Sequence, residues 1–146
     1  MSSLNLNPGR SSRSDPSKID HAASRLLEML PVPAYLWEPR TESFLGSNAL
    51  FREVTGYSEE EVIRLDWREL LAPEDLNKGQ QLIATKANED IDQRVWRTKS
   101  GKLVRVTRSA RLLQFVDDKH NVREAYIALV THVEGQERKE AGGILP

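Results

Sequence analysis

The chain has 146 residues, 38% of them hydrophobic, which suits one compact domain with tails rather than two separate cores. Its 21 basic and 22 acidic side chains give a formal net charge of −1, so bulk electrostatics favours neither nucleic acid nor an anionic membrane as a partner. The sequence contains no cysteine, which excludes disulfides, thiolate metal sites and cysteine nucleophiles. No stretch reaches the roughly 18 consecutive apolar residues of a membrane helix, and residues 1–17 lack the apolar core of a signal peptide. We therefore expect a soluble, cytoplasmic protein whose membrane anchor, if it has one, lies outside this chain.

The beginning of the chain predicts a polar tail followed by a helix. Residues 1–14 show no apolar periodicity and are predicted to be disordered. Asp15 and Pro16 are typical of a helix start, and apolar residues then recur at helical spacing as far as residue 30. This predicts an amphipathic leader helix over residues 15–30, whose apolar stripe either packs on the domain or pairs with a second chain. For the homodimer that such pairing would give, the predicted contacts are Ile19, Ala23, Leu26, Leu27 and Leu30, together with Trp96 from a later strand.

The next segment predicts two short strands and a helix. The strands are expected at residues 34–37 and 43–46, with a turn between them. Asn48 can cap a helix over residues 49–54, and Gly56 can end it by adopting a positive φ.

Two further helix starts follow. Ser58 and Glu61 form a capping box, with serine at the N-cap and glutamate at the third helical position. Pro73-Glu74-Asp75 opens another helix, expected to run to about Asn88.

The second half of the chain predicts β-structure. Strands are expected at residues 93–99, 103–115 and 125–133, with a polar loop over 116–124. The last strand is mostly apolar, which indicates a central, buried position. The order of two strands, several helices and three strands predicts an α+β domain: a five-stranded antiparallel sheet with short helices on one face, preceded by the amphipathic N-terminal helix.

Several motifs between residues 30 and 135 carry a family resemblance. They are GSNALF at 46–51, VTGYSEEEV at 54–62, LAPED at 71–75 and KSGK at 99–102. In this order and spacing the chain resembles the PAS (sensory box) family, which implies a PAS domain over residues 31–135 and a C-terminal tail or signalling linker over 136–146. The sequence departs from the family at His132-Val133-Glu134, where many members have Asp-Ile-Thr and use the aspartate to couple the domain to the following helix.

The resemblance implies a pocket between helices and sheet, and the residue types narrow what it holds. Flavin–cysteine and coumaryl-thioester photoreceptors need a cysteine, so cysteine-linked chromophores are excluded. Haem is disfavoured, because residues 76–90, where relatives commonly carry the axial histidine, contain none. The three histidines are isolated and predict no metal site. No cofactor is predicted, and a non-covalent small molecule stays open.

Position in the family pattern also suggests which residues line the pocket. The predicted lining residues are Phe51, Val54, Tyr57, Val62, Leu65, Leu70, Leu82, Val104 and Leu129. The alternative is that these residues simply fill the core. Arg94, Arg97 and Arg108 alternate with apolar residues on strands; the favoured interpretation is a solvated face, whereas an inward-pointing arginine would bind a carboxylate ligand. Trp96 is either a pocket lid or a dimer contact.

Two functional hypotheses lead; a third, a small α+β enzyme with a cone-shaped pocket, is disfavoured because the expected pocket positions are nearly all apolar and offer no buried acid or base. The sequence shows no nucleophile set beside a histidine and an acid, and no glycine-rich phosphate loop. The resemblance implies a signal-transduction module that binds a small ligand or a partner and relays a conformational change to an effector on another chain or beyond the C-terminus. The leader helix and residues 136–140 would carry the signal. The alternative is a ligand-free PAS module for dimerisation or protein interaction.

Overall fold

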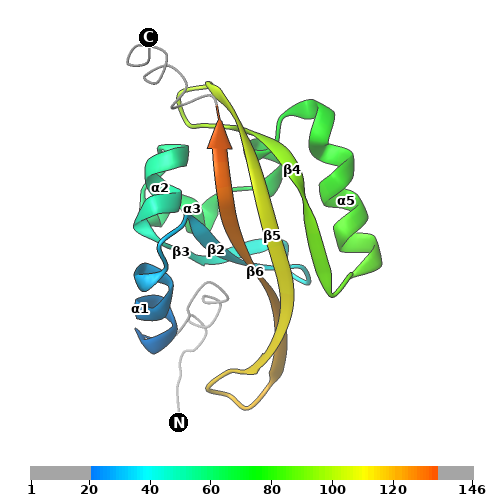
Figure 1. Cartoon of the computed structure of the whole chain (residues 1–146). Helices are drawn as coiled ribbons and strands as arrows, with labels where there is room; N and C mark the ends of the chain where they lie inside the picture. The colour runs from blue at the N-terminus through cyan, green and yellow to red at the C-terminus, as the bar shows by residue number, and fades with distance from the viewer. Residues whose placement is uncertain (1–20, 135–146) are drawn as a thin grey trace.

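The computed structural model describes residues 21–134, which form a five-stranded sheet with helices packed against it (Figure 1). All neighbouring strands are antiparallel and follow the order β3-β2-β6-β5-β4, so the last strand lies at the centre, as its apolar composition predicts. The elements in chain order are α1 (His21–Met29), β2 (Ala34–Glu38), β3 (Ser43–Ser47), α2 (Ala49–Thr55), α3 (Glu59–Arg64), α4 (Trp67–Leu70), the 3₁₀ turn η2 (Pro73–Asp75), α5 (Leu76–Thr85), β4 (Glu89–Arg97), β5 (Leu103–Val116) and β6 (Val122–Glu134).

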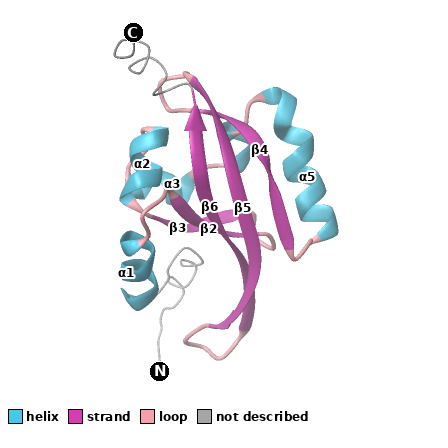
Figure 2. Ribbon diagram, in the orientation of Figure 1, coloured by secondary structure: helices cyan, strands magenta, loops and turns pink. Residues whose placement is uncertain are grey.

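The hydrophobic core lies between the inner face of the sheet and helices α2 to α5 (Figure 2). Side chains alternate across a strand, so every second residue points into this layer. Val104, Val106 and Val130 from the sheet are buried there together with Phe51 and Val62 from the helices. The predicted α+β class, with short helices on one face of a five-stranded antiparallel sheet, is confirmed.

The predicted caps are present with their expected hydrogen bonds. Asn48 Oδ1 accepts the Phe51 N–H at 3.0 Å, and Gly56 ends α2 with a φ of 85°. Ser58 Oγ accepts the Glu61 N–H at 3.2 Å, and the Glu61 carboxylate accepts the Ser58 N–H at 2.9 Å. These local signals place α2 and α3 because each satisfies backbone N–H groups that a helix start leaves unpaired.

Three predicted boundaries are wrong. The helix expected to continue to about Asn88 ends at Thr85, because Lys86 turns left-handed with a φ of 51°. β4 begins at Glu89 rather than at residue 93, since pairing with β5 overrides the weak strand propensity of its aspartates.

The third concerns the loop predicted over residues 116–124, which is confined to residues 117–121, because both of its ends belong to strands. Val116 pairs with Val122, and only a short turn separates them. Asp117 Oδ1 fixes that turn by accepting the N–H groups of Lys119 and Asn121, each at 2.9 Å. A side chain that bonds its own backbone therefore shortens the loop.

The outer edge of the sheet at β4 is covered by the η2–α5 segment. Asp75 Oδ2 accepts the N–H of Val95 at 2.6 Å, and the carbonyl of Val95 accepts the N–H of Ala72 at 2.8 Å. The Lys78 ammonium donates to the carbonyl of Gln93 at 2.8 Å. Asp75 is the last residue of the LAPED motif, so one role of that motif here is to pair backbone groups of an edge strand.

Candidate functional site

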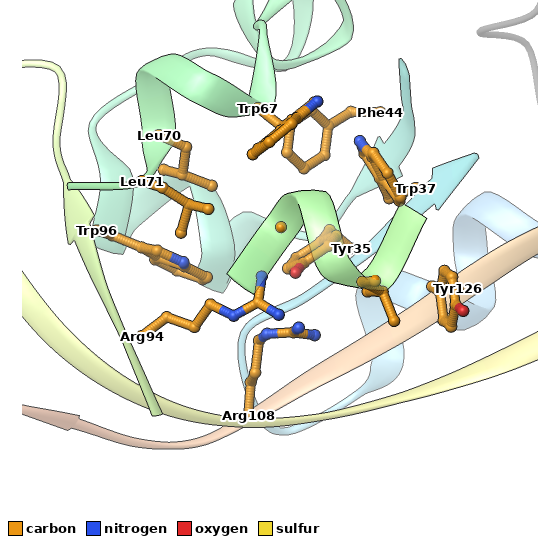
Figure 3. Close-up of a pocket in the computed structure, with 12 residues that line it drawn as sticks. Tyr35, Trp37, Phe44, Trp67, Leu70, Leu71, Arg94, Trp96, Arg108 and Tyr126 are labelled. Atoms are coloured by element: carbon orange, nitrogen blue, oxygen red, sulfur yellow. The ribbon is translucent and has the colours of Figure 1, made fainter. Parts of the chain in front are cut away.

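A small cavity of about 40 Å³ lies between the sheet and helices α4 and α5. Its walls are largely aromatic and aliphatic, with two arginines on the sheet side (Figure 3). The lining residues are Tyr35, Trp37, Phe44, Trp67, Leu70, Leu71, Gly79, Leu82, Arg94, Trp96, Arg108 and Tyr126. Apolar walls with a few polar groups are typical of ligand sites in proteins.

The two arginines lie inside the domain. Arg94 on β4 is 6% exposed and Arg108 on β5 is 2% exposed. The prediction that they belong to a solvated face is therefore wrong for both. Arg94 is two residues from the buried Trp96, and Arg108 is two residues from the buried Val106, so strand alternation turns them inward. Because each arginine shares its strand parity with a buried apolar residue, this parity is the signal in the sequence that predicts its inward orientation. Arg97 has the opposite parity and is half-buried.

Two aspartates on β4 pair with these arginines. Asp90 Oδ2 accepts from Arg94 Nη2 at 2.8 Å and from Arg108 Nη2 at 2.5 Å. Asp92 Oδ2 accepts from Arg94 Nε at 3.1 Å, and its other oxygen lies 3.5 Å from Arg108 Nε. The aspartate side chains are about a quarter exposed, at 26% and 25%, whereas the arginine side chains are at most 7% exposed. The deep end of the cluster, on the cavity side, is therefore its positive end.

Hydrogen bonding inside this cluster is incomplete. Each guanidinium carries five N–H donors, yet the described residues accept only three hydrogen bonds from the pair. Arg108 Nε, Trp37 Nε1 and Asp92 Oδ1 are buried without a hydrogen-bond partner among the described residues. Such groups are rare in folded proteins because each loses its hydration without compensation. Two of the three are donors on cavity-lining side chains.

The hydroxyl of Tyr35 completes the polar end of the cavity. Tyr35 comes from β2 at the opposite side of the sheet, and Figure 3 shows its hydroxyl directed toward the two guanidinium groups. Burial disfavours the charged form of Arg108, but the acidic groups around it, Asp92 and Asp90 among them, outweigh burial and raise the pKa of Arg108. The guanidinium is therefore held as a cation in a dry, aromatic setting.

Most of the predicted pocket residues fill the core without lining the cavity. Leu70 and Leu82 are the two predicted residues that do line it. Leu129 is wrong as a pocket residue, because it is opposite in parity to the buried Val130 and Ala128 and so faces the outside of the sheet. The remaining predicted residues belong to the core or pack against it; they are Phe51, Val54, Tyr57, Val62, Leu65 and Val104.

The predicted dimer contacts divide into buried and exposed residues. Trp96 is 1% exposed within the domain, where it packs on Phe51 with ring centres 5.3 Å apart, so its prediction as a dimer contact is wrong. Leu27 is likewise covered by its own domain, whereas Leu26 on the same helix is 64% exposed. Ala23 and Leu30 are half-buried. Ile19, the predicted tail and the segment from residue 136 lie outside the described residues.

Helix α1 is tied to the domain through Asn48. The Asn48 amide donates to the carbonyls of Leu27 at 3.1 Å and Val32 at 2.9 Å, while its Oδ1 accepts the N–H groups of Ala34 and Phe51, both at 3.0 Å. One buried side chain thus joins α1, the segment after it, β2 and α2. Because Phe51 also packs on Tyr35 with ring centres 5.2 Å apart, this junction is one aromatic ring away from the cavity.

A second contact fixes the outer side of α1. Glu28 accepts the Ala49 N–H at 2.9 Å and pairs with Arg52 at 2.9 Å. Burial opposes ionisation of Glu28, but the hydrogen bonds from Arg52 and Ala49 outweigh it and lower the pKa of its carboxyl. Glu28 therefore adds a charge-assisted link between α1 and the start of α2.

Residues 21–134 contain neither a membrane-spanning helix nor a cluster of metal ligands. No helix there is long and apolar enough to cross a membrane. No group of three or more histidine, aspartate or glutamate side chains in the same range is placed to hold a metal ion.

Comparison with solved structures gives one recurring fold. A PAS domain of a two-component sensor histidine kinase is 18% identical with a TM-score of 0.60, covering 75% of this chain and 92% of that one. A PAS domain from Colwellia psychrerythraea is 10% identical with a TM-score of 0.59, covering 77% and 95%. The LOV domain of the Erythrobacter litoralis EL346 blue-light activated histidine kinase is 18% identical with a TM-score of 0.55, covering 70% and 95%.

Comparison at the level of sequence gives the family. No curated protein matches the chain. The sequence profile of the PAS fold family matches residues 44–128, which is more than half of the chain. That segment runs from the second residue of β3 through β5 to the middle of β6, and it includes both arginines of the cavity. The chain belongs to the PAS fold family.

Proposed function

We propose that this domain is a sensory PAS module that holds a small molecule in the cavity and relays its binding to an effector. The observation that carries the proposal is a pair of buried arginines, with most of their N–H donors unbonded, on one side of an otherwise apolar cavity. A core built only for stability gains nothing from buried guanidinium N–H groups that lack acceptors, because each costs free energy. A ligand that accepts hydrogen bonds would recover part of that cost.

The size of the cavity limits the ligand. On the measure by which one buried water needs roughly 10–15 Å³, the 40 Å³ present here accommodates about three atoms of that size. A flavin, the subject of one LOV structure of this fold, does not fit, since three tryptophans and two arginines occupy the space around the cavity. The proposed ligand is therefore a molecule of only a few non-hydrogen atoms.

The proposed relay runs from the cavity to α1. Trp96 and Tyr35 line the cavity and pack on Phe51 of α2, whose first turn is held by Asn48. Asn48 and Glu28 in turn hold α1, so a shift of α2 moves that helix. Solved domains of this fold come from sensor histidine kinases, which supports an effector on another chain or further along this one.

Native mass spectrometry of freshly purified protein, followed by thermal unfolding with added ligands, tests the proposal. The expected result is a small retained mass, or a melting temperature that rises with ligand concentration. A clean apo mass together with no stabilisation by any small polar molecule would overturn it. Trp67→Phe should leave the fold intact while altering the response, because it changes one cavity wall.

A ligand-free dimerisation module is the second candidate, favoured by the surface of α1. Leu26 and Met29 are 64% and 76% exposed, which is unusual for two large apolar side chains on one short helix. Sedimentation at increasing concentration should show a dimer that Leu26→Lys disrupts. The control is Leu103→Lys, the same change at a leucine 51% exposed at the start of β5. A monomer at all concentrations contradicts this candidate.

A further inference from the structure

We propose that the ligand of this cavity is a short-chain carboxylate, held by Arg94, Arg108 and Tyr35. This inference rests on the sensory function proposed above and names the chemical class of its ligand. It follows from three properties of the site: the sign of its charge, the supply of donors, and its shape.

The charge facing the cavity is positive. Arg94 and Arg108 line the cavity, whereas Asp90 and Asp92 do not. The aspartates are partly solvated at the edge of the sheet, while the guanidinium groups are buried. An anion entering the cavity therefore meets two cations before it meets their counter-ions, in surroundings where charges are weakly screened.

The donors match the acceptors of a carboxylate. The described residues accept only three hydrogen bonds from the ten N–H groups of the two guanidiniums, so most of these donors have no protein acceptor. Paired, planar donors of this kind suit the two oxygens of a carboxylate, which arginine binds in a two-pronged fashion. The Tyr35 hydroxyl, directed at the same point, offers a further donor (Figure 3).

The shape restricts the rest of the ligand. The walls opposite the arginines are Trp67, Phe44, Leu70 and Leu82, which offer apolar contacts and no charge. A carboxylate therefore fits at the sheet side with a short apolar tail toward α4 and α5. The volume favours ligands of the size of acetate or propionate over longer acids, dicarboxylates and aromatic acids.

The three tryptophans provide the readout, because the chain has only Trp37, Trp67 and Trp96 and all three line the cavity. Their indole N–H signals in a two-dimensional NMR spectrum should shift saturably on titration with sodium propionate. Sodium chloride at equal ionic strength should not reproduce the shifts. Propionamide, the neutral analogue of the same shape, should bind at least tenfold more weakly. For so few atoms the dissociation constant is expected on the order of millimolar.

Variants test the residues. Tyr35→Phe keeps the ring packing and should weaken propionate binding about three- to tenfold. Arg108→Lys keeps the charge but loses the planar pair of donors, and should weaken it more strongly. Arg105→Gln, on the same strand but exposed on the outer face, is the matched control and should bind as the wild type does. Dispersed spectra of each variant establish that it is folded.

The outcomes distinguish failure of the carboxylate assignment from failure of the proposed sensory function. Propionamide binding as well as propionate overturns the carboxylate assignment but leaves a small-molecule sensor standing. A neutral molecule found in the protein by native mass spectrometry also overturns the carboxylate assignment and leaves the small-molecule sensor standing. Propionate binding unaffected by Tyr35→Phe and Arg108→Lys overturns the assigned residues. No binding of any small molecule overturns both proposals.

Discussion

Gly79 and Trp67 are so close that a Cβ at position 79 would lie 2.4 Å from Cζ3 of the indole ring. Both residues line the cavity. The glycine is therefore part of the cavity wall, and its missing side chain makes room for the tryptophan.

Gly79→Ala should destabilise the domain although alanine is the better helix former. The propensity gain is about 1 kcal/mol, whereas overpacking costs about 1–3 kcal/mol. Trp67 cannot rotate away freely because its Nε1 donates to Glu42 at 3.0 Å. We expect a net loss of up to about 2 kcal/mol in urea unfolding. Gln80→Ala, the exposed neighbour on the same helix, is the control; a Gly79→Ala protein as stable as that control contradicts the argument.

Asn48→Ala should be among the most damaging single changes in the domain. It removes the α2 cap and leaves two N–H groups and two carbonyls in a buried region without their partner. Loss of a cap costs about 1 kcal/mol and buried unpaired groups add to it, so we expect a loss of about 2–4 kcal/mol. The free energy of unfolding in urea measures this.

An exposed asparagine provides the matched control for Asn48→Ala. Asn77→Ala, at an exposed asparagine on α5, should change stability by less than about 0.5 kcal/mol. If Asn48→Ala lowers the free energy of unfolding by less than about 1 kcal/mol, water replaces the lost hydrogen bonds. Asn48 then does not hold the junction of α1, β2 and α2 as proposed.

Asp75→Ala should open the β4 edge. The Val95 N–H loses its acceptor at 2.6 Å and Lys78 loses an ion pair at 3.4 Å. Amide hydrogen exchange at Val95 should accelerate by one to two orders of magnitude, the equivalent of about 1–3 kcal/mol. Glu74→Ala, at the exposed neighbour, should leave that amide protected. Unchanged exchange at Val95 in the Asp75 variant would contradict the role of Asp75 in protecting this edge.

Glu28 should make the stability of α1 depend on pH in the acidic range. Its folded pKa is lowered, so its contribution is fully present above the unfolded value of about 4.3 and is lost as the pH falls through the folded pKa. The stability difference between wild type and Glu28→Gln should therefore shrink as the pH falls from about 6 to about 3. In an Arg52→Met background the shrinkage should be smaller, because Arg52 supplies a hydrogen bond and the opposing charge. A difference independent of pH contradicts this account.

The sequence predicted the fold where local and periodic signals agree. Asn48, Ser58 and Gly56 placed the helix ends because caps depend on residues close in sequence. The apolar run of β6 predicted its central position because a strand buried on both sides needs apolar residues on both faces. Sequence analysis misses the early part of β4 because its aspartates pair with Arg108 on the next strand, a contact that local propensity does not contain.

The site was predicted less well than the fold. A list of apolar positions describes a core, and it does not show where packing leaves a gap: the gap is set by Gly79, Trp67 and the arginines together. Arg94 and Arg108 have the strand parity of inward-pointing residues. A charged side chain is so rarely buried, however, that sequence alone favours a solvent-exposed face for them. Their burial depends on Asp90 and Asp92, which lie on the same strand as Arg94 and on the strand next to Arg108.

The pairing of the β4 edge has a consequence for assembly and for solubility. A strand from another molecule extends a sheet by bonding to free N–H and carbonyl groups, and these are also the groups that start amyloid-like aggregation. At β4 the groups of Val95 and the carbonyl of Gln93 are already occupied by η2 and α5. A partner on this side must therefore bind by a face or a helix, and a chain with an impaired LAPED segment should aggregate through β4 before it unfolds completely.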